Sequence, residues 1–308
     1  MKHGFILNPA AGKTDRTAEV AAAIREVFAG QDYVIETSKG PGDCERIARE
    51  MAEAFGSCRL YACGGDGTLN EVVNGAAGHP DCAVTHYPIG SGNDFIKASS
   101  DPAAFEDLRA FLDPGERVFD LIQVNERLGL NICSVGIDAR IGTEVGKYKR
   151  LPLVSGSGAY ILSTVVNVVK GVTAHYVVEL GGERIDGRQT MICVCNGRWY
   201  GGGFNPVPDA LLDDGLLDVL LVRPVTRLQV ASVIGKYKAG HYRQVPELIR
   251  HEQVTELRVL CDRPSAVNID GELLTAKDVV FRISPHKIRF FHPKGLAWEA
   301  VPAAMKNP

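Results

Sequence analysis

The first 122 residues alternate between short apolar segments typical of strands and periodic segments typical of helices. The alternation runs through Phe5–Leu7, Thr17–Phe28, Tyr33–Glu36, Cys44–Phe55, Arg59–Cys63, Leu69–Ala77 and Ala83–Pro88. Segments that alternate in this way build a parallel, doubly wound α/β sheet. Ligands of such sheets bind beyond the carboxyl ends of the strands, so the loops that follow the strands are the first place to look for function.

After about residue 122 the pattern changes to strand-like segments separated by turn residues, which predicts a largely antiparallel second domain. The expected strands are Asn131–Val135, His175–Leu180, Thr190–Asn196, Leu217–Val222, Glu256–Cys261, Ala266–Ile269, Val279–Ile283 and Ile288–Phe291, with helices near Ala139–Lys149, Tyr160–Val169 and Leu228–Ala239. We therefore expect a first domain of residues 1–125 and a second of residues 126–285 that share a cleft. Residues 286–308 are a candidate segment to rejoin the first domain.

Composition narrows the class of protein. The 308 residues suffice for two domains, and 45% hydrophobic with 23% charged residues is typical of a globular protein. A formal net charge of −3 argues against a nucleic-acid partner. The first residues do not resemble a signal peptide, and the longest uncharged stretch, between Arg150 and Lys170, is too short in its apolar part for a spanning helix. Eight cysteines without a CxxC pair favour reduced thiols in a soluble, cytoplasmic protein.

The segment Cys63–Glu71 places a glycine-rich turn, Gly64-Gly65-Asp66-Gly67, between a buried strand and a helix. Backbone N–H groups in such a turn can bind phosphate oxygens, and glycine allows the close approach. A carboxylate beside polyphosphate repels it unless a cation intervenes, so Asp66 suggests Mg²⁺. The alternative is a tight strand–helix turn with an aspartate that caps the helix.

Two further loops follow strands of the same expected sheet. The segment Asn8–Lys13 is a candidate phosphate turn with a mobile cation, although its spacing is not that of a Walker A loop. The segment Pro88–Asp94 supplies two glycines, a hydroxyl, an amide and a carboxylate. Together with the Asp66 turn, these loops on one rim suit a nucleotide triphosphate. Asp94 has a helix cap as its alternative role, and Asn268–Glu272 by itself predicts a hairpin with an Asp-Gly turn.

The set NPAAGK, GGDGTLNEVVNG, PIGSGNDF, NGRWYGGGFNPVPDALLDDGLLDV and the late DGE resembles the soluble diacylglycerol-kinase-like lipid kinases, which include bacterial members and the sphingosine kinases. The resemblance covers nearly the whole chain in the family's order. It implies a first domain similar to that of NAD kinases and a second, mostly antiparallel β-sandwich domain. The chain departs from the family at Ser91, where threonine is usual, and at Ala11, where serine is frequent.

The resemblance also implies roles for individual residues. The ATP site would comprise Asn8, Pro9, Ala10, Ala11, Gly12, Lys13, Thr37, Gly64, Gly65, Asp66, Gly67, Thr68, Asn70, Glu71 and Ser91. Asp66, Asp94 and Asp120 would organise catalytic Mg²⁺ and the lipid hydroxyl, and Glu272 matches the proposed general base, with Asp270 as the alternative. A separate structural Mg²⁺ would be held by Asp214 and by the carbonyls of Leu211 and Leu216, whose oxygen atoms suit this hard ion.

The activity implied is transfer of the γ-phosphate of ATP to a lipid hydroxyl, with diacylglycerol as the expected acceptor and phosphatidic acid as the product. The alternatives are an NAD kinase-like enzyme, which shares GGDGT, and a catalytically inactive lipid-binding regulator. The lipid partner would be met at a membrane surface, at the inner face, and a homodimer remains open. Candidate membrane contacts are the loop Trp199–Phe204 and the basic residues Lys147, Lys149, Arg150, Lys236, Lys238, His241 and Arg243.

Overall fold

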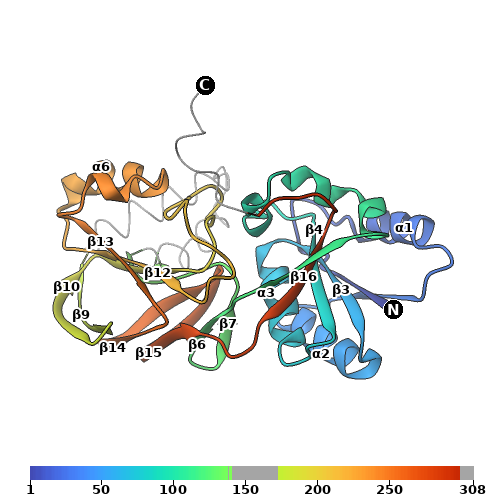
Figure 1. Ribbon diagram of the computed structural model, residues 1–308, viewed down its shortest axis with the longest axis horizontal. Coiled ribbons are helices and arrows are strands. Elements are labelled where there is room, and N and C mark those ends of the chain that lie inside the picture. The colour runs from blue at the N-terminus through green and yellow to red at the C-terminus, as the bar shows by residue number, and fades with distance from the viewer. Residues whose placement is uncertain (138, 141–172, 299–308) are drawn as a thin grey trace. The chain divides into compact units, whose positions relative to one another are not determined.

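The computed structural model describes residues 1–137, 139–140 and 173–298, which form two compact units (Figure 1). Unit 1 contains Met1–Leu121, Leu212–Asp214 and the described chain from Ser284 onward, and unit 2 contains the described parts of Ile122–Leu211 and Gly215–Ile283. The helix expected at Tyr160–Val169, nearly all of that at Ala139–Lys149, and the basic residues at 147, 149 and 150 lie outside the described residues.

Unit 1 is built on a six-stranded sheet with the strand order β2-β1-β3-β4-β16-β5. The strands are β1 (Lys2–Leu7), β2 (Tyr33–Thr37), β3 (Cys58–Gly64), β4 (Cys82–Pro88), β5 (Gly115–Phe119) and β16 (Ile288–His292). The helices are α1 (Thr17–Val27), α2 (Asp43–Phe55) and α3 (Asp66–Ala76), and the 3₁₀ turns are η1 (Phe95–Ala98), η2 (Pro102–Glu106) and η3 (Leu108–Phe111). Strands β1 to β4 run parallel, as the alternating sequence pattern predicts.

Helices cover both faces of this sheet because successive side chains of each strand point to opposite sides. Phe5 of β1 stacks on Tyr61 of β3 with ring centroids 4.0 Å apart and also meets Phe28, directly after α1. Gly4 faces the other way, where a Cβ would lie 2.6 Å from the sulfur of Met51 on α2. The aromatic face therefore packs under α1 and the opposite face under α2, which is the doubly wound arrangement.

The carboxyl-terminal strand β16 returns to unit 1 and completes its sheet. It pairs in parallel with β4 and antiparallel with β5. Phe290 and Phe291 of β16 are fully buried, and Phe291 meets Tyr61 with ring centroids 4.9 Å apart. The packing of these rings explains why a strand so late in the sequence belongs to the first sheet.

Unit 2 is a ten-stranded antiparallel assembly, whose main path is β13-β12-β11-β8-β14-β15-β6-β7, with β9 joining β14 to β10. Its strands are β6 (Ile122–Val124), β7 (Arg127–Gly129), β8 (Ile132–Gly136), β9 (Ala174–Leu180), β10 (Glu183–Gln189), β11 (Met191–Cys195), β12 (Leu217–Val222), β13 (Ile249–Val254), β14 (Glu256–Ile269) and β15 (Glu272–Ile283). Helix α6 (Arg227–Lys238) and the turn η4 (Tyr242–Gln244) accompany them.

The long strand β14 joins the two halves of unit 2. Its first half pairs with β9 and its second half with β8, with a break in the β14–β15 register between Leu260 and Ser265. The sequence pattern predicted two separate strands here, because the polar residues at the break resemble a turn. A buried core lies on each face of the assembly, one around Val194 and Val259, the other around Cys193 and Leu220.

Within the described part of the chain, no helix is both long and apolar enough to span a membrane.

Candidate nucleotide site

Three loops lie side by side at the carboxyl ends of β1, β3 and β4, which are neighbours in the sheet. They are Asn8–Lys13, Gly64–Thr68 and Ile89–Asp94, so the structure brings together the loops that the sequence singled out. Gly65 and Gly90 touch so closely that a Cβ on Gly90 would overlap with the Cα of Gly65. Glycine is required here because two backbones meet with no room for a side chain.

Hydrogen bonds fasten these three loops to one another. The carbonyl oxygen of Gly64 accepts from the backbone N–H groups of Ile89 and Gly90, each at 3.0 Å. The side chain of Asn8 donates to the hydroxyl of Thr68 at 2.9 Å and accepts from the N–H of Ala10 at 2.9 Å. The rim is thus a preorganised backbone surface, as binding of a polyphosphate requires.

The two carboxylates of Asp66 and Asp94 flank Gly92. A Cβ on that glycine would lie 2.6 Å from Oδ2 of Asp66 and 3.8 Å from Oδ2 of Asp94. Asp66, the first residue of α3, also accepts the N–H of Asp94 at 2.6 Å and that of Phe95 at 3.4 Å through Oδ1. Asp66 therefore holds the loop that follows β4, a structural role that the sequence did not predict.

Burial raises the pKa of Asp66, and the nearby negative charge of Asp94 adds to the effect, while His86 acts in the opposite direction. Two acids in one partly desolvated site favour a cation, and carboxylate oxygens are the ligands that Mg²⁺ prefers. The donor set at Asp66 and Asp94 therefore fits Mg²⁺. The described residues contain no group of three or more His, Cys, Asp or Glu that could hold a metal ion by themselves, so substrate or water oxygens would have to complete the coordination.

Lys97 and His86 belong to this site and were missed in the sequence analysis. The ammonium of Lys97 lies 2.5 Å from Oδ1 of Asp94. Asp94 itself is only 4% exposed. The carboxylate of Asp94 makes no capping hydrogen bond to the turn η1, so the helix-cap alternative is wrong. The spacing of three residues between Asp94 and Lys97 was the available signal, whereas His86, inside a buried strand, offered none.

The remaining residues expected at the nucleotide differ in exposure. Lys13 and Ser91 are exposed in the loops that follow β1 and β4, and Thr37 is exposed as the last residue of β2, so a ligand can reach all three. Asn70 is buried in α3, and its side chain accepts a hydrogen bond from Asn74 at 3.1 Å. Its place in the structure indicates a role inside the helix.

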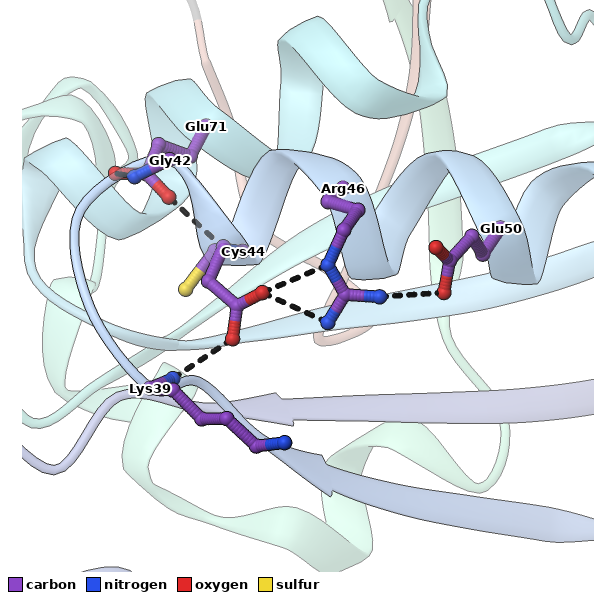
Figure 2. Close-up of polar contacts among 7 residues, drawn as sticks. Lys39, Gly42, Cys44, Arg46, Glu50 and Glu71 are labelled. Atoms are coloured by element: carbon purple, nitrogen blue, oxygen red, sulfur yellow. Dashed lines mark hydrogen bonds and ion pairs between the residues drawn. The ribbon is translucent and has the colours of Figure 1, made fainter.

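Glu71 connects α3 to α2 (Figure 2). Its two carboxylate oxygens accept the N–H groups of Gly42 at 2.9 Å and Cys44 at 3.0 Å. Helix α2 makes no capping hydrogen bond from its own cap residue, Gly42, so a side chain of the neighbouring helix satisfies its first donors. The sequence grouped Glu71 with the ATP residues. The structure shows it holding Gly42 and Cys44, where the loop that follows β2 enters α2. In the same loop, the N–H of Lys39 donates to Asp43 at 2.7 Å.

Asp120 follows β5 and is completely buried. Its carboxylate forms an ion pair with Lys287 at 2.7 Å, and its N–H donates to the carbonyl oxygen of Leu212 at 2.7 Å. Whereas Asp66 and Asp94 share the glycine rim, Asp120 fastens the segments Leu212–Asp214 and Ser284 onward to β5.

The two acids of the Asp-Gly turn in unit 2 are in different environments. Asp270 and Gly271 have φ angles of 50° and 100° and form a two-residue hairpin turn between β14 and β15. The carboxylate of Asp270 accepts the N–H groups of Leu130, Asn131 and Ile132, at 2.5, 3.0 and 2.8 Å. Glu272 is exposed at the start of β15. The carboxylate of Asp270 is occupied by three hydrogen bonds from backbone N–H groups, which makes it a poor general base. The side chain of Glu272, by contrast, is accessible.

The loop expected to hold a structural metal passes from one unit to the other. Asp214 belongs to unit 1, whereas Leu211 and Leu216 belong to unit 2. The neighbouring Asp213 pairs with Arg117 at 2.5 Å. Asp214 is exposed, and its carboxylate oxygens are hard donors of the kind that Mg²⁺ prefers.

Comparison with known proteins identifies the family. Residues 2–124 match the diacylglycerol kinase catalytic domain, and residues 131–292 match the YegS C-terminal NAD kinase beta sandwich-like domain. A probable lipid kinase YegS-like protein of Pseudomonas aeruginosa strain PAO1 is 32% identical, over 92% of this chain and 93% of the relative. One of Chromohalobacter salexigens is 30% identical, over 95% and 94%.

Solved structures share the fold. A diacylglycerol kinase of Bacillus anthracis str. Sterne superposes with a TM-score of 0.67 at 19% identity, covering 95% of this chain and 97% of that one. The α/β first unit and the antiparallel second unit are thus those of the expected fold class. The chain belongs to the YegS-like lipid kinases, a kinase family whose membership implies the use of ATP.

Proposed function

We propose that this protein transfers the γ-phosphate of ATP to the free hydroxyl of diacylglycerol and so forms phosphatidic acid. The observation that carries the proposal is the interlocked glycine rim at β1, β3 and β4, with the carboxylates of Asp66 and Asp94 beside Gly92. Phosphoryl transfer depends mainly on positioning and on charge neutralisation, and this rim supplies backbone donors and acids for both.

The proposed work of each residue follows from its surroundings. The N–H groups of the glycine rim bind phosphate oxygens, and Asp66 and Asp94 hold Mg²⁺. When bound, Mg²⁺ neutralises the charge that develops on the phosphates. Lys97, beside Asp94, contributes a further positive charge at the rim. Glu272 accepts the proton of the lipid hydroxyl, which leaves only as the new bond to phosphorus forms, so a strong base is unnecessary.

The experiment that tests the proposal incubates the protein with Mg²⁺, γ-labelled ATP and separate acceptors: diacylglycerol, other hydroxyl lipids and NAD⁺. Labelled phosphatidic acid is the expected product, and Asp66→Asn is the negative control. Another labelled lipid would replace diacylglycerol as the acceptor. Labelled NADP⁺ would indicate an NAD kinase instead, and lipid binding without any labelled product would indicate an inactive regulator.

A further inference from the structure

His86 is a fully buried polar residue near the carboxyl end of β4. Its Nε2 lies 3.0 Å from the carbonyl oxygen of Gly64. A carbonyl oxygen can only accept, so Nε2 carries a hydrogen and donates it. Nδ1 finds no hydrogen-bond partner among the described residues. The ring thus directs its one effective donor at the first residue of the glycine turn.

The carbonyl of Gly64 is the point where the two glycine loops are joined. Besides His86, the N–H groups of Ile89 and Gly90 donate to it. The Gly64 carbonyl and the Gly65 N–H belong to one planar peptide unit, and in a trans peptide they point in opposite directions. Three donors that fix the direction of the carbonyl therefore also fix the opposite direction, in which the Gly65 N–H points.

His86 is a poor choice for the stability of the fold. A buried nitrogen without a partner is unfavourable, and an apolar side chain of similar size would avoid that loss. The packing of β4 therefore does not explain the histidine. The fixed orientation of the Gly64–Gly65 peptide explains it better, because an N–H group that already has the right orientation binds an anion without a cost of reorganisation.

We infer that His86 is a positioning residue for the nucleotide, which fixes the Gly64–Gly65 peptide so that the Gly65 N–H meets a phosphate group. The inference rests on the proposed function, since it takes the glycine turn as the phosphate site. It adds His86 to the residues that determine nucleotide binding. His86 would not touch the nucleotide and would act through the Gly64–Gly65 peptide.

The test compares His86→Leu and His86→Gln with the unaltered protein by calorimetric titration of ADP and of adenosine. His86→Leu should weaken ADP binding about tenfold, the loss expected for one donor to a charged group. Adenosine, which has no phosphate, should bind within about twofold of its original affinity. The unfolding temperature should not fall, because leucine removes an unsatisfied nitrogen. His86→Gln should recover most of the ADP affinity, because its amide can donate in the place of Nε2.

Thr85→Val is the matched control. Thr85 is also fully buried on β4, and its hydroxyl also lacks a hydrogen-bond partner in the described chain. Adjacent strand residues point to opposite faces, so this change should leave ADP binding unaltered. Unchanged ADP affinity in His86→Leu, or an equal loss for ADP and adenosine, would overturn the inference alone. If the unaltered, folded protein bound no ADP, the proposed function and the inference would both fail.

Discussion

At the scale of single residues, the carboxylate of Asp66 has two opposing effects on stability: its hydrogen bonds hold a neighbouring loop, and its buried negative charge is unfavourable. Its Oδ1 holds the backbone of Asp94 and Phe95, and its burial raises the pKa of the carboxyl group. A raised pKa means that the folded protein binds this proton more tightly than the unfolded chain does. The stabilising contribution is complete below the ordinary pKa of an aspartate and is lost as the pH rises through the raised value.

We therefore predict that Asp66→Asn abolishes kinase activity and does not destabilise the metal-free protein at neutral pH. The amide oxygen can still accept from Asp94 and Phe95, and the variant carries no charge at position 66. Thermal unfolding without Mg²⁺ between pH 4 and pH 8 tests this. The variant should gain in unfolding temperature relative to the unaltered protein as the pH rises. A difference that is constant with pH would show that the charge of Asp66 carries no cost.

The Asp-Gly turn separates a structural acid from the proposed base. Glu272→Gln should lower kcat by about 10²–10⁴-fold, the usual value of general-base catalysis, with little change in the KM for ATP. Asp270→Asn should instead lower the free energy of unfolding by about 2 kcal/mol, since an amide cannot accept from all three backbone donors. Kinetics and urea unfolding of both variants check this. A fully stable Asp270→Asn with a collapsed kcat would exchange the two roles.

At the scale of elements, Glu71 determines how α2 begins. We predict that Glu71→Ala costs about 1 kcal/mol of stability, as loss of a helix cap does. The same change should raise the KM for ATP more than it lowers kcat, because the loop before α2 follows the nucleotide-side end of β2. Steady-state kinetics and thermal unfolding measure the two effects. Glu50→Ala is the control, since Glu50 is exposed and forms an ion pair with Arg46 on the same helix (Figure 2).

The elements also show what the sequence could predict. The parallel sheet and its three loops followed from local patterns, because each strand is apolar and each glycine turn stands directly after one. The contacts of Asp66, Glu71 and Asp270 with distant backbone could not be predicted. Their partners lie 28, 27 and about 140 residues away, and a carboxylate that binds N–H groups has the same sequence signature as one that binds a cation. The continuity of β14 across its register break could not be predicted either, because the polar residues at the break resemble a turn.

At the scale of the whole molecule, the chain passes from one unit to the other at residues 121/122, 211/212, 214/215 and 283/284. The short segment Leu212–Asp214 is therefore held in unit 1 while both of its flanks belong to unit 2. Two contacts fasten it, from the Asp120 N–H to the Leu212 carbonyl and from Arg117 to Asp213. Whatever stabilises this segment therefore stabilises unit 1.

A structural Mg²⁺ at Asp214 would stabilise this segment, so we predict that the unfolding temperature depends on Mg²⁺ through Asp214. A ligand that binds only the folded state stabilises it by about 2.7 kcal/mol at a hundredfold excess over Kd. For units of this size that corresponds to an unfolding temperature higher by roughly 5–10 °C. We expect this gain when Mg²⁺ is added to the unaltered protein. Asp214→Ala should lose most of this gain, measured as the difference between its unfolding temperatures in Mg²⁺ and in EDTA.

Asp213→Ala is the matched control, because it changes the neighbouring acid of the same segment. Its ion pair with Arg117 is about one-third exposed on both sides, so its loss should cost at most about 1 kcal/mol, equally with Mg²⁺ and with EDTA. The discriminating quantity is thus the dependence of each variant's unfolding temperature on Mg²⁺. If Asp214→Ala is destabilised to the same extent in both buffers, Asp214 acts through protein contacts alone. If Mg²⁺ still stabilises that variant fully, the ion binds elsewhere, and the acids of the glycine rim become the site to test.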